Sequence, residues 1–298
     1  MRSSFRWFVL ACSPSLAGCA ATCLNGGTAI DSVPYTIAKP GAYCLARTVQ
    51  GKAGADGITI VASHVTVDMQ GNALLGVGDA GHAISAQRST ANLAVFNGTI
   101  DGWGRTGLFA PNVTGGHYER LRVMSNKFDG MAVGSHSIVD QCTVGWNGTR
   151  ETIEHNGQTA ERGSGDGISI GHSSTVMNSI VFANVIDGIV VRDGGTVSRC
   201  TSEFNGRAGV WASNGGAVVT ENVLQNNFFG VLASRTYNRI DDNEVRFNGT
   251  GIAALAFDSV TRNDTISNTT NITGGPNNGF GPKGAARTTS SPWANELH

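Results

Sequence analysis

The chain has 298 residues, of which 41 are glycine and 14% are charged, so it is rich in glycine and poor in charge compared with an average soluble protein. This composition excludes coiled coils and highly charged disordered chains. The 21 Lys and Arg residues balance 22 Asp and Glu residues, so the sequence predicts no nucleic-acid-binding surface.

Residues 1–19 are predicted to be an export signal. Arg2 and Arg6 precede a short apolar stretch, which Leu-Ala-Gly-Cys at 16–19 follows. These four residues resemble a bacterial lipobox, which implies that Cys19 carries lipid and anchors the protein to the outer membrane. Cleavage after Ala21 would instead release a secreted protein. In either case the protein is exported, and a lipid anchor is the only membrane contact that the sequence predicts.

Four cysteines remain after the signal. In an oxidising compartment, Cys23 and Cys44 would close a small N-terminal loop through a disulfide. Cys142 and Cys200 fall at equivalent positions two repeats apart, too distant for a disulfide, so we expect them to be buried core residues. No Cys-x-x-Cys spacing indicates a zinc site.

A repeat of 21 residues dominates the rest of the chain. Glycines followed by Ile or Val recur at 167, 188, 209, 230 and 251, and asparagines recur in phase at 126, 147, 184, 205, 227, 248 and 268. Short β-branched runs lie between these markers, as expected for strands. One such unit cannot bury its apolar side alone, but stacked coils can, with strands about 4.8 Å apart. We expect the asparagines to hydrogen-bond along the stack and the glycines to adopt positive φ at a corner.

This pattern resembles the right-handed parallel β-helix proteins. The resemblance implies an all-β, single-stranded solenoid of roughly ten coils over residues 57–270, with an inserted loop at 149–165. Residues 20–56 resemble the N-terminal cap of exported β-helix proteins. The segment 271–298 is predicted to be a tail, whose Ser-Pro-Trp-Ala-Asn stretch resembles the ends of uncharacterised exported bacterial members.

The inserted loop is the first candidate for function, because it concentrates charge in a chain with little charge elsewhere. It contains Glu154 and His155. In an eliminative lyase, His155 would be the base and Arg192 would neutralise the carboxylate of the substrate. In a hydrolase, Asp166 together with Asp187 or Glu154 would flank the scissile bond. A purely solvated loop is the structural alternative.

Three aspartates precede equivalent glycines in neighbouring coils. Asp129, Asp166 and Asp187 should lie in one column, where a Ca²⁺ ion or a shared proton would relieve their repulsion. The alternative is ordinary Asp-Gly turn chemistry, in which each carboxylate caps local backbone N–H groups. No other metal ligand or cofactor is predicted.

The residues two places after each recurring glycine should point outward. Ser169, Val190, Trp211 and Leu232 would then form a column, with an exposed apolar stripe over its last three members. Trp211, Ser169 and Ser213 are therefore the predicted sugar-binding residues. The alternative is that Phe280 or Trp293 of the tail covers the stripe.

Comparison with families of this fold transfers no catalytic residue. Residues 165–171, Gly-Asp-Gly-Ile-Ser-Ile-Gly, resemble a polygalacturonase segment in which a histidine stands in place of Asp166. The Asp-Asp pair that polygalacturonases carry in a preceding coil, their later Arg-Ile-Lys, and the Asp-Pro-His of alginate epimerases are absent.

The sequence thus predicts a monomeric, exported envelope protein that binds a polysaccharide along its long face, with cleavage as a lyase or hydrolase left open. The first alternative is a non-catalytic surface or adhesion protein that presents the 149–165 loop to a protein partner. A second alternative, an accessory role in envelope metal loading, has no Met, His and Cys cluster to support it.

Overall fold

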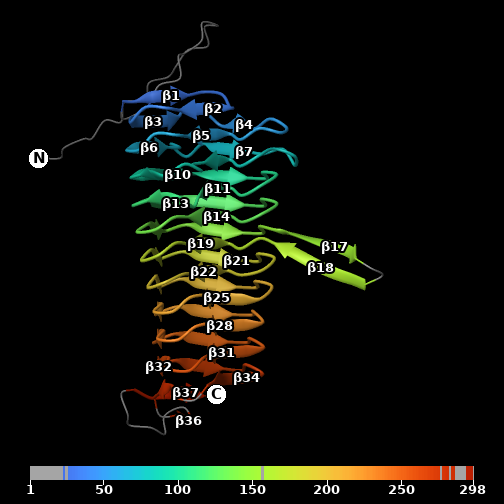
Figure 1. Cartoon of the computed structure of the whole chain (residues 1–298), viewed down its shortest axis with the longest axis vertical. Helices are drawn as coiled ribbons and strands as arrows, with labels where there is room; N and C mark the ends of the chain where they lie inside the picture. The colour runs from blue at the N-terminus through green and yellow to red at the C-terminus, as the bar shows by residue number, and fades with distance from the viewer. Residues whose placement is uncertain are drawn as a thin grey trace, which may run out of the picture.

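The computed structural model describes residues 23, 26–155, 158–275, 277–281, 283–285 and 293–297, without the side chains of 151–163 and 283–285. The chain winds into a straight stack of coils, with a hairpin projecting from the middle (Figure 1). The predicted export signal and Cys19 lie outside the described residues. No helix occurs in the described part, so none there could cross a membrane.

One face of the solenoid is an 11-stranded parallel sheet with one strand from each coil, so the stack has eleven coils where the repeat predicts roughly ten. Its strands are β2 (Tyr35–Ile37), β5 (Ile58–Ile60), β8 (Ile84–Ser85), β11 (Leu108–Ala110), β14 (Met131–Val133), β19 (Ile168–Ile170), β22 (Ile189–Val191), β25 (Ala208–Ala212), β28 (Phe229–Ala233), β31 (Thr250–Ala254) and β34 (Thr270–Gly274).

The remaining wall is a 22-stranded sheet, to which most coils give two strands. Its strands are β1 (Thr28–Ile30), β3 (Gly41–Leu45), β4 (Val49–Gln50), β6 (Val65–Asp68), β7 (Ala73–Leu75), β10 (Leu93–Asp101), β13 (His117–Met124), β15 (Ile138–Asp140), β16 (Thr143–Gly145), β20 (Thr175–Met177), β21 (Ile180–Phe182), β23 (Thr196–Ser198), β24 (Thr201–Glu203), β26 (Val218–Thr220), β27 (Val223–Gln225), β29 (Arg239–Asp241), β30 (Glu244–Arg246), β32 (Ser259–Thr261), β33 (Asp264–Ile266), β35 (Gly279–Phe280), β36 (Lys283–Ala285) and β37 (Asn295–Leu297). Two small sheets remain. They are the parallel pair β9 (Thr90–Ala91) and β12 (Val113–Thr114), and the antiparallel hairpin β17 (Thr149–His155) and β18 (Gln158–Ser164).

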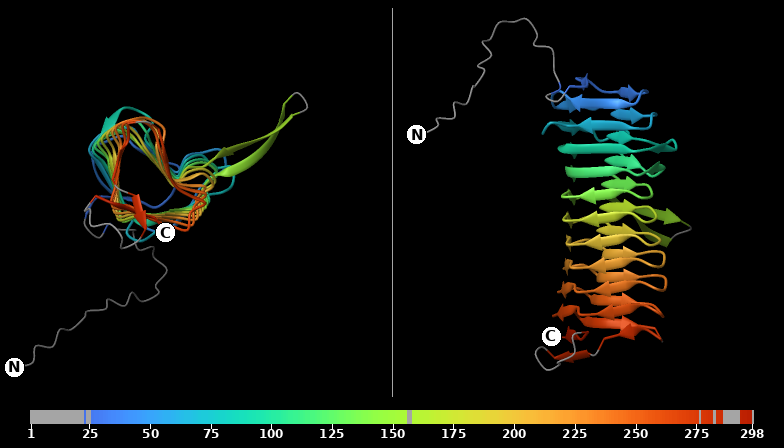
Figure 2. Two further views of the ribbon diagram at one scale, coloured as in Figure 1. Left: turned by 90° about the horizontal axis from the view of Figure 1, so that it is seen from below. Right: turned by 90° about the vertical axis from the view of Figure 1, so that its left-hand side faces the viewer.

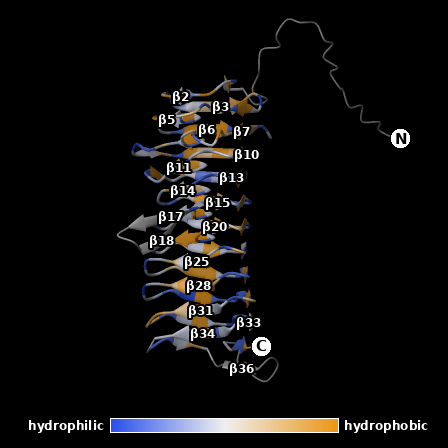
Figure 3. Ribbon diagram, turned by 90° about the vertical axis from the view of Figure 1, so that its right-hand side faces the viewer, coloured by the Kyte–Doolittle hydropathy of each residue, from blue (hydrophilic) through white to orange (hydrophobic). Residues whose placement is uncertain are grey.

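Register confirms that residues one repeat apart lie on top of one another. Ile168 pairs with Ile189, Ile189 with Val210, and Val210 with Val231, and all four side chains are fully buried. These ladders fill the interior, and Figure 3 shows hydrophobic residues along many of the strands, for example β10 and β25, with hydrophilic residues between them. Each buried CH₂ group stabilises the fold by about 0.8 kcal/mol, so this continuous core is the main source of stability.

The predicted asparagine ladder is present along the full series. From Asn126 to Asn268, each side-chain Nδ2 donates a hydrogen bond to Oδ1 of the asparagine in the next coil, at 2.9–3.2 Å. The ladder satisfies buried amides that would otherwise each lose hydration without compensation. A second ladder, through Asn222, Asn243, Asn263 and Asn295, runs along another corner.

The expected role of the recurring glycines is wrong. Positive φ occurs instead at the residue before each asparagine of the first ladder, for example 53° at Ala183 and 56° at Phe204. Gly167 is required by close packing, because a Cβ there would lie 2.4 Å from Cγ1 of Val181 and 2.6 Å from the carbonyl oxygen of Gly188.

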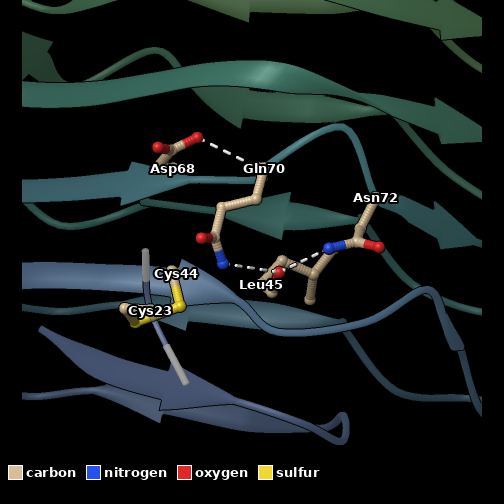
Figure 4. Close-up of a disulfide and its surroundings, with 6 residues drawn as sticks. All are labelled: Cys23, Cys44, Leu45, Asp68, Gln70 and Asn72. Carbon is tan, nitrogen blue, oxygen red and sulfur yellow. Dashed lines mark hydrogen bonds between the residues drawn. A yellow bond between two sulfur atoms is a disulfide. The ribbon is translucent and has the colours of Figure 1, made fainter. Parts of the chain in front are cut away.

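At the N-terminal end, Cys23 and Cys44 form a disulfide with a Cα–Cα distance of 5.6 Å. Figure 4 shows it beside the Leu45 carbonyl, which accepts hydrogen bonds from Nδ2 of Asn72 (2.7 Å) and Nε2 of Gln70 (3.4 Å). Within the segment predicted as a cap, β1 to β4 already pair with strands of the following coils. A separate cap over residues 20–56 therefore stays a prediction.

The C-terminal segment differs from the predicted tail, because its described residues extend the solenoid. In β35, Phe280 pairs with Val260 and packs against the core, and in β37 the buried Asn295 ends the second asparagine ladder. Trp293 lies over the guanidinium of Arg262, 5.4 Å from the ring centroid. Both aromatic residues thus contact the 22-stranded side of the molecule.

Candidate functional site

Two hollows adjoin on the outer face of the 11-stranded sheet. The first, about 300 Å³, is lined by Phe109, Pro111, Asp129, Ala132, Val133, Asp166, Ser169, Ile170, Gly171 and Arg192. The second, about 470 Å³, is lined by His82, Gln87, Arg105, Thr106, Phe109, Phe128, Asp129 and Ser164. Because Phe109 and Asp129 line both, the hollows form one groove over β8, β11, β14, β19 and β22. We call it the acidic groove.

The outward column of the sheet forms the floor of this groove. Phe109, Ala132 and Ser169 pair in register on β11, β14 and β19, and the column continues through Val190 and Trp211 to Leu232. The predicted apolar stripe is interrupted, because Val190 is only 2% exposed. It lies beside the larger Trp211, over whose ring the Arg207 guanidinium is stacked at 4.1 Å.

The three aspartates form the predicted column at the start of these strands. The backbone N–H of Asp166 donates to Oδ1 of Asp129 (3.0 Å), that of Asp187 donates to Oδ1 of Asp166 (3.3 Å), and that of Ala208 donates to Oδ1 of Asp187 (3.0 Å). Each carboxylate therefore caps the backbone of the next coil, which is the turn chemistry that the Asp-Gly pattern allows. This arrangement also holds the carboxylates one coil apart.

Asp166 is the group whose protonation the site perturbs most. Burial, followed by the negative charges of Asp187 and Asp129, raises the pKa of Asp166 to about 7. Burial also raises the pKa of Asp129, against the lowering effects of the Asp166 N–H and the Arg192 charge. A carboxylic acid with a pKa near neutrality that faces a hollow can accept or donate a proton at physiological pH.

Asp187 has a different environment. Its side chain is fully buried, Nε of Arg207 donates to its Oδ1 at 2.9 Å, and Nη2 of Arg207 donates to Oδ2. Arg207 in turn stacks on Trp211, whose Nε1 donates to Oγ of Ser234 (2.7 Å). With both carboxylate oxygens occupied, Asp187 positions Arg207 and Trp211 instead of facing the groove.

The structure therefore brings together only part of the predicted site. Asp166, Ser169 and Arg192 line the same hollow, as Asp129 does. Trp211 lies further along the column, and Oγ of Ser213 donates to the carbonyl of Val191 (3.2 Å). These two residues belong to the next part of the same face.

The predicted loop is a two-stranded hairpin that leaves the solenoid at one corner (Figure 2). Its base is closed by Gly148 and Gly165, packed so tightly that a Cβ on Gly165 would lie 2.1 Å from the Cα of Gly148. Glu154 and His155 fall on β17, and their side chains lie outside the description. The base of the hairpin adjoins the acidic groove through Ser164.

Several groove residues were not predicted from the sequence, among them His82, Phe109 and Arg105. His82 stacks on Phe109, with ring centroids 4.4 Å apart, and its Nδ1 lies 3.3 Å from the carbonyl oxygen of Thr106. Burial lowers the pKa of His82, against the opposing charge of Asp56. Arg105 adds a second cation to the groove.

The aspartate column does not fit a Ca²⁺ site. Among the described residues there is no group of three or more His, Cys, Asp or Glu side chains able to hold a metal ion. One oxygen of each aspartate accepts a backbone N–H, and Arg207 occupies the second oxygen of Asp187. Calcium sites usually provide six to eight oxygen ligands, which these three carboxylates do not supply.

An extended parallel solenoid with a grooved sheet face defines the structural class of the molecule. Residues 82–245 match the model of the family described as right handed beta helix region, so the chain belongs to that family. No curated protein matches the chain.

Solved structures show the same fold at low sequence identity. The A-module of the mannuronan C-5 epimerase AlgE6 of Azotobacter vinelandii matches with a TM-score of 0.62 and 13% identity, covering 85% of this chain and 89% of that one. Pectate lyase Pel9A matches with a TM-score of 0.52 and 15% identity, covering 85% and 73% of the two chains. Similarity at this level of identity shows the fold alone.

Proposed function

We propose that this protein binds an acidic polysaccharide along the acidic groove. The observation that carries the proposal is the meeting of Asp129, Asp166 and Arg192 in one hollow of the sheet face. An exposed guanidinium can form two parallel hydrogen bonds to a sugar carboxylate. Arg105 lines the adjoining hollow and provides a second such group along the same line.

The structural neighbours support this ligand class. One of them is an epimerase of mannuronan and the other a lyase of pectate, and both polymers consist of acidic sugars. The groove of this chain lies on a sheet face of the same type of solenoid and combines cations with aromatic surface. Phe109 supplies aromatic surface within the groove, and Trp211 supplies more further along the same face, where a bound sugar chain would continue.

Asp166 is the group best suited to catalysis if the bound chain is also cleaved. For elimination, Arg192 would neutralise the carboxylate of the sugar while ionised Asp166, as the base, removes the proton from the adjacent carbon. For hydrolysis, Asp166 would protonate the leaving oxygen, with Asp129 as the second carboxylate. His155 and Glu154 on β17 remain further proposed participants, since the hairpin starts beside the groove.

The experiment is a binding titration with polygalacturonate and alginate oligosaccharides. Arg192→Ala should weaken binding by about tenfold or more, because it removes a charged hydrogen-bonding contact. The matched control is Arg199→Ala, since Arg199 is a half-exposed arginine in the turn between β23 and β24, away from the groove, and pairs with Glu221 at 3.6 Å. Absence of wild-type binding, or equal losses in both variants, would refute the proposal.

The same oligosaccharides test cleavage separately. Wild-type protein that forms a new ultraviolet-absorbing double bond is a lyase, and protein that forms only new reducing ends is a hydrolase. Asp166→Asn should abolish either product while leaving binding within about threefold, a change below 1 kcal/mol. Binding without any product assigns a non-catalytic, lectin-like role.

We also propose that the protein acts outside the cytoplasm. The Cys23–Cys44 disulfide supports this proposal, because such bonds persist in oxidising compartments. Lipidation at Cys19, free secretion and a monomeric state remain proposals based on the sequence. Metabolic labelling with a fatty acid in wild-type and Cys19→Ser protein distinguishes the anchored form from the secreted one.

A second candidate function is presentation of the β17–β18 hairpin to a protein partner. The hairpin projects from the stack and forms a separate two-stranded sheet, without a strand of the solenoid paired to it (Figures 1 and 2). Deletion of residues 149–164 should then abolish adhesion to the partner while glycan binding persists. Loss of glycan binding alone would assign the hairpin to the groove.

A further inference from the structure

Three exposed aromatic side chains form a straight row along one corner of the solenoid. Trp146, Phe204 and Phe247 are 56%, 59% and 55% exposed. Each immediately precedes an asparagine of the first buried ladder, so all three hold the same position in their coils. We call them the aromatic row.

The rings occupy every second coil. Backbone hydrogen bonds place Ala183 in the coil between Trp146 and Phe204, and Asn226 in the coil between Phe204 and Phe247. Two coils span about 9.6 Å, so the three rings repeat at that interval and extend over about 19 Å. Phe228, which packs edge-on against Phe229, belongs to the neighbouring position on the corner.

The local backbone does not favour aromatic residues here. The three residues have φ of 54–56°, in the left-handed region that Gly and Asn adopt with less strain. Asn226 shows the favoured choice at the same corner, with φ of 56°. A large apolar side chain that is exposed and occupies a left-handed position does little for the core, so its presence needs another reason.

The shape of the row selects the kind of ligand. A specific protein partner normally buries about 800 Å² on each side, which a single row of three rings separated by Ala183 and Asn226 does not offer. The neighbouring column begins beside Trp146 with Phe182, which packs edge-on against it with ring centroids 4.9 Å apart. It continues through Glu203, Gln225 and Arg246, which are linked by hydrogen bonds, and Arg246 also pairs with Glu244. These charges are compensated within the protein, so the strip favours an uncharged ligand.

We propose that the aromatic row is a second glycan-binding site, specific for a neutral, extended, β-linked polysaccharide. In such a chain alternate sugars turn the same face to one side, and the repeat of one disaccharide is close to the two-coil interval. Each ring would stack on one sugar, and successive rings would stack on alternate sugars of the chain. The three rings would thus hold one chain parallel to the solenoid axis. The site shares no residue with the acidic groove and does not depend on the function proposed for it.

The test uses the full chain and neutral glucans. Wild-type protein should be retarded in a gel containing hydroxyethylcellulose, and its affinity for cello-oligosaccharides should rise from cellobiose to cellohexaose as more rings are engaged. Phe204→Asn should weaken binding of cellohexaose by about tenfold, the loss of one well-packed aromatic contact. The same change should leave the melting temperature equal or higher, because asparagine suits the left-handed backbone.

Tyr237→Ala is the matched control, since Tyr237 is 72% exposed with a φ of 66° at a different corner. It should bind cellohexaose like the wild type, as should Arg192→Ala, which affects only the acidic groove. The proposal is overturned if the wild type ignores neutral glucans or if Tyr237→Ala is as harmful as Phe204→Asn. It is also overturned if sedimentation shows a dimer that Phe204→Asn dissociates, because a second copy then covers the row.

Discussion

Replacing Asp166 by asparagine should change how the stability of the protein depends on pH. The pKa of Asp166 rises from 3.8 to about 7 on folding, because burial and the charges of Asp187 and Asp129 disfavour its ionised form. A carboxyl whose folded pKa is raised binds its proton more tightly in the native state. Its ionisation therefore destabilises the fold progressively as pH rises from about 4 to about 7.

The size of this effect follows from the two pKa values. An interval of about three pH units, at 1.36 kcal/mol each, gives a penalty on the order of 4 kcal/mol once Asp166 is ionised. The asparagine of the variant would be neutral at every pH and could still accept the backbone N–H of Asp187 through its side-chain oxygen. The free energy of unfolding of Asp166→Asn minus that of the wild type should therefore increase by about 4 kcal/mol between pH 4 and pH 8.

Urea denaturation followed by circular dichroism at several pH values measures this difference. Asp241→Asn is the control: burial would raise the pKa of Asp241, but hydrogen bonds from Arg262, Thr261 and Arg239 outweigh it and lower the pKa to about 2. The free energy of unfolding of Asp241→Asn should be about 2 kcal/mol below that of the wild type at every pH from 5 to 8. The difference stays constant because the wild-type group is ionised in both the folded and the unfolded chain over that range. A flat difference for Asp166→Asn would refute the reasoning about the aspartate column.

Three further predictions concern the solenoid itself. Asn205→Ala should lower the free energy of unfolding by about 3 kcal/mol, because the buried Asn184 amide loses its acceptor. In the half-buried control Asn214→Ala the loss should be less than about 0.5 kcal/mol, and equal losses in the two variants would argue against the ladder. Deleting the 16 residues Thr149–Ser164 restores the 21-residue spacing, so the melting temperature should stay within a few degrees, whereas collapse of the β-sheet circular dichroism signal would contradict an independent hairpin. Cys44→Ser should lower the free energy of unfolding by about 3 kcal/mol, because the N-terminal loop is no longer closed in the unfolded chain. A reductant should destabilise the wild type but not the variant.

The fold was predictable because one spacing is repeated with little variation. The recurring glycines and asparagines identify the solenoid, its apolar columns and the first ladder, all of which the register confirms. The expected role of Gly167 is wrong, because contacts with Val181 in the opposite sheet of the same coil and with the Gly188 carbonyl of the next coil, and not φ, exclude a side chain there. The sequence does not reveal such close approaches between coils.

The candidate site was only partly predictable. Asp166 and Arg192 fall in the regular coils, so their phase gives their positions. His82 and Arg105 lie in early coils of 23–26 residues, where no fixed spacing relates them to the later columns. Burial of Val190 depends on the size of its neighbour Trp211, which periodicity alone does not describe.

A crystal structure of the wild type soaked with a polygalacturonate oligosaccharide tests the acidic groove most directly. The sugar chain should lie over β11, β14 and β19, with one carboxylate within hydrogen-bonding distance of the Arg192 guanidinium and a ring above Ser169 beside Asp166. An oligosaccharide bound only elsewhere on the solenoid, with the groove containing ordered water alone, would contradict the account.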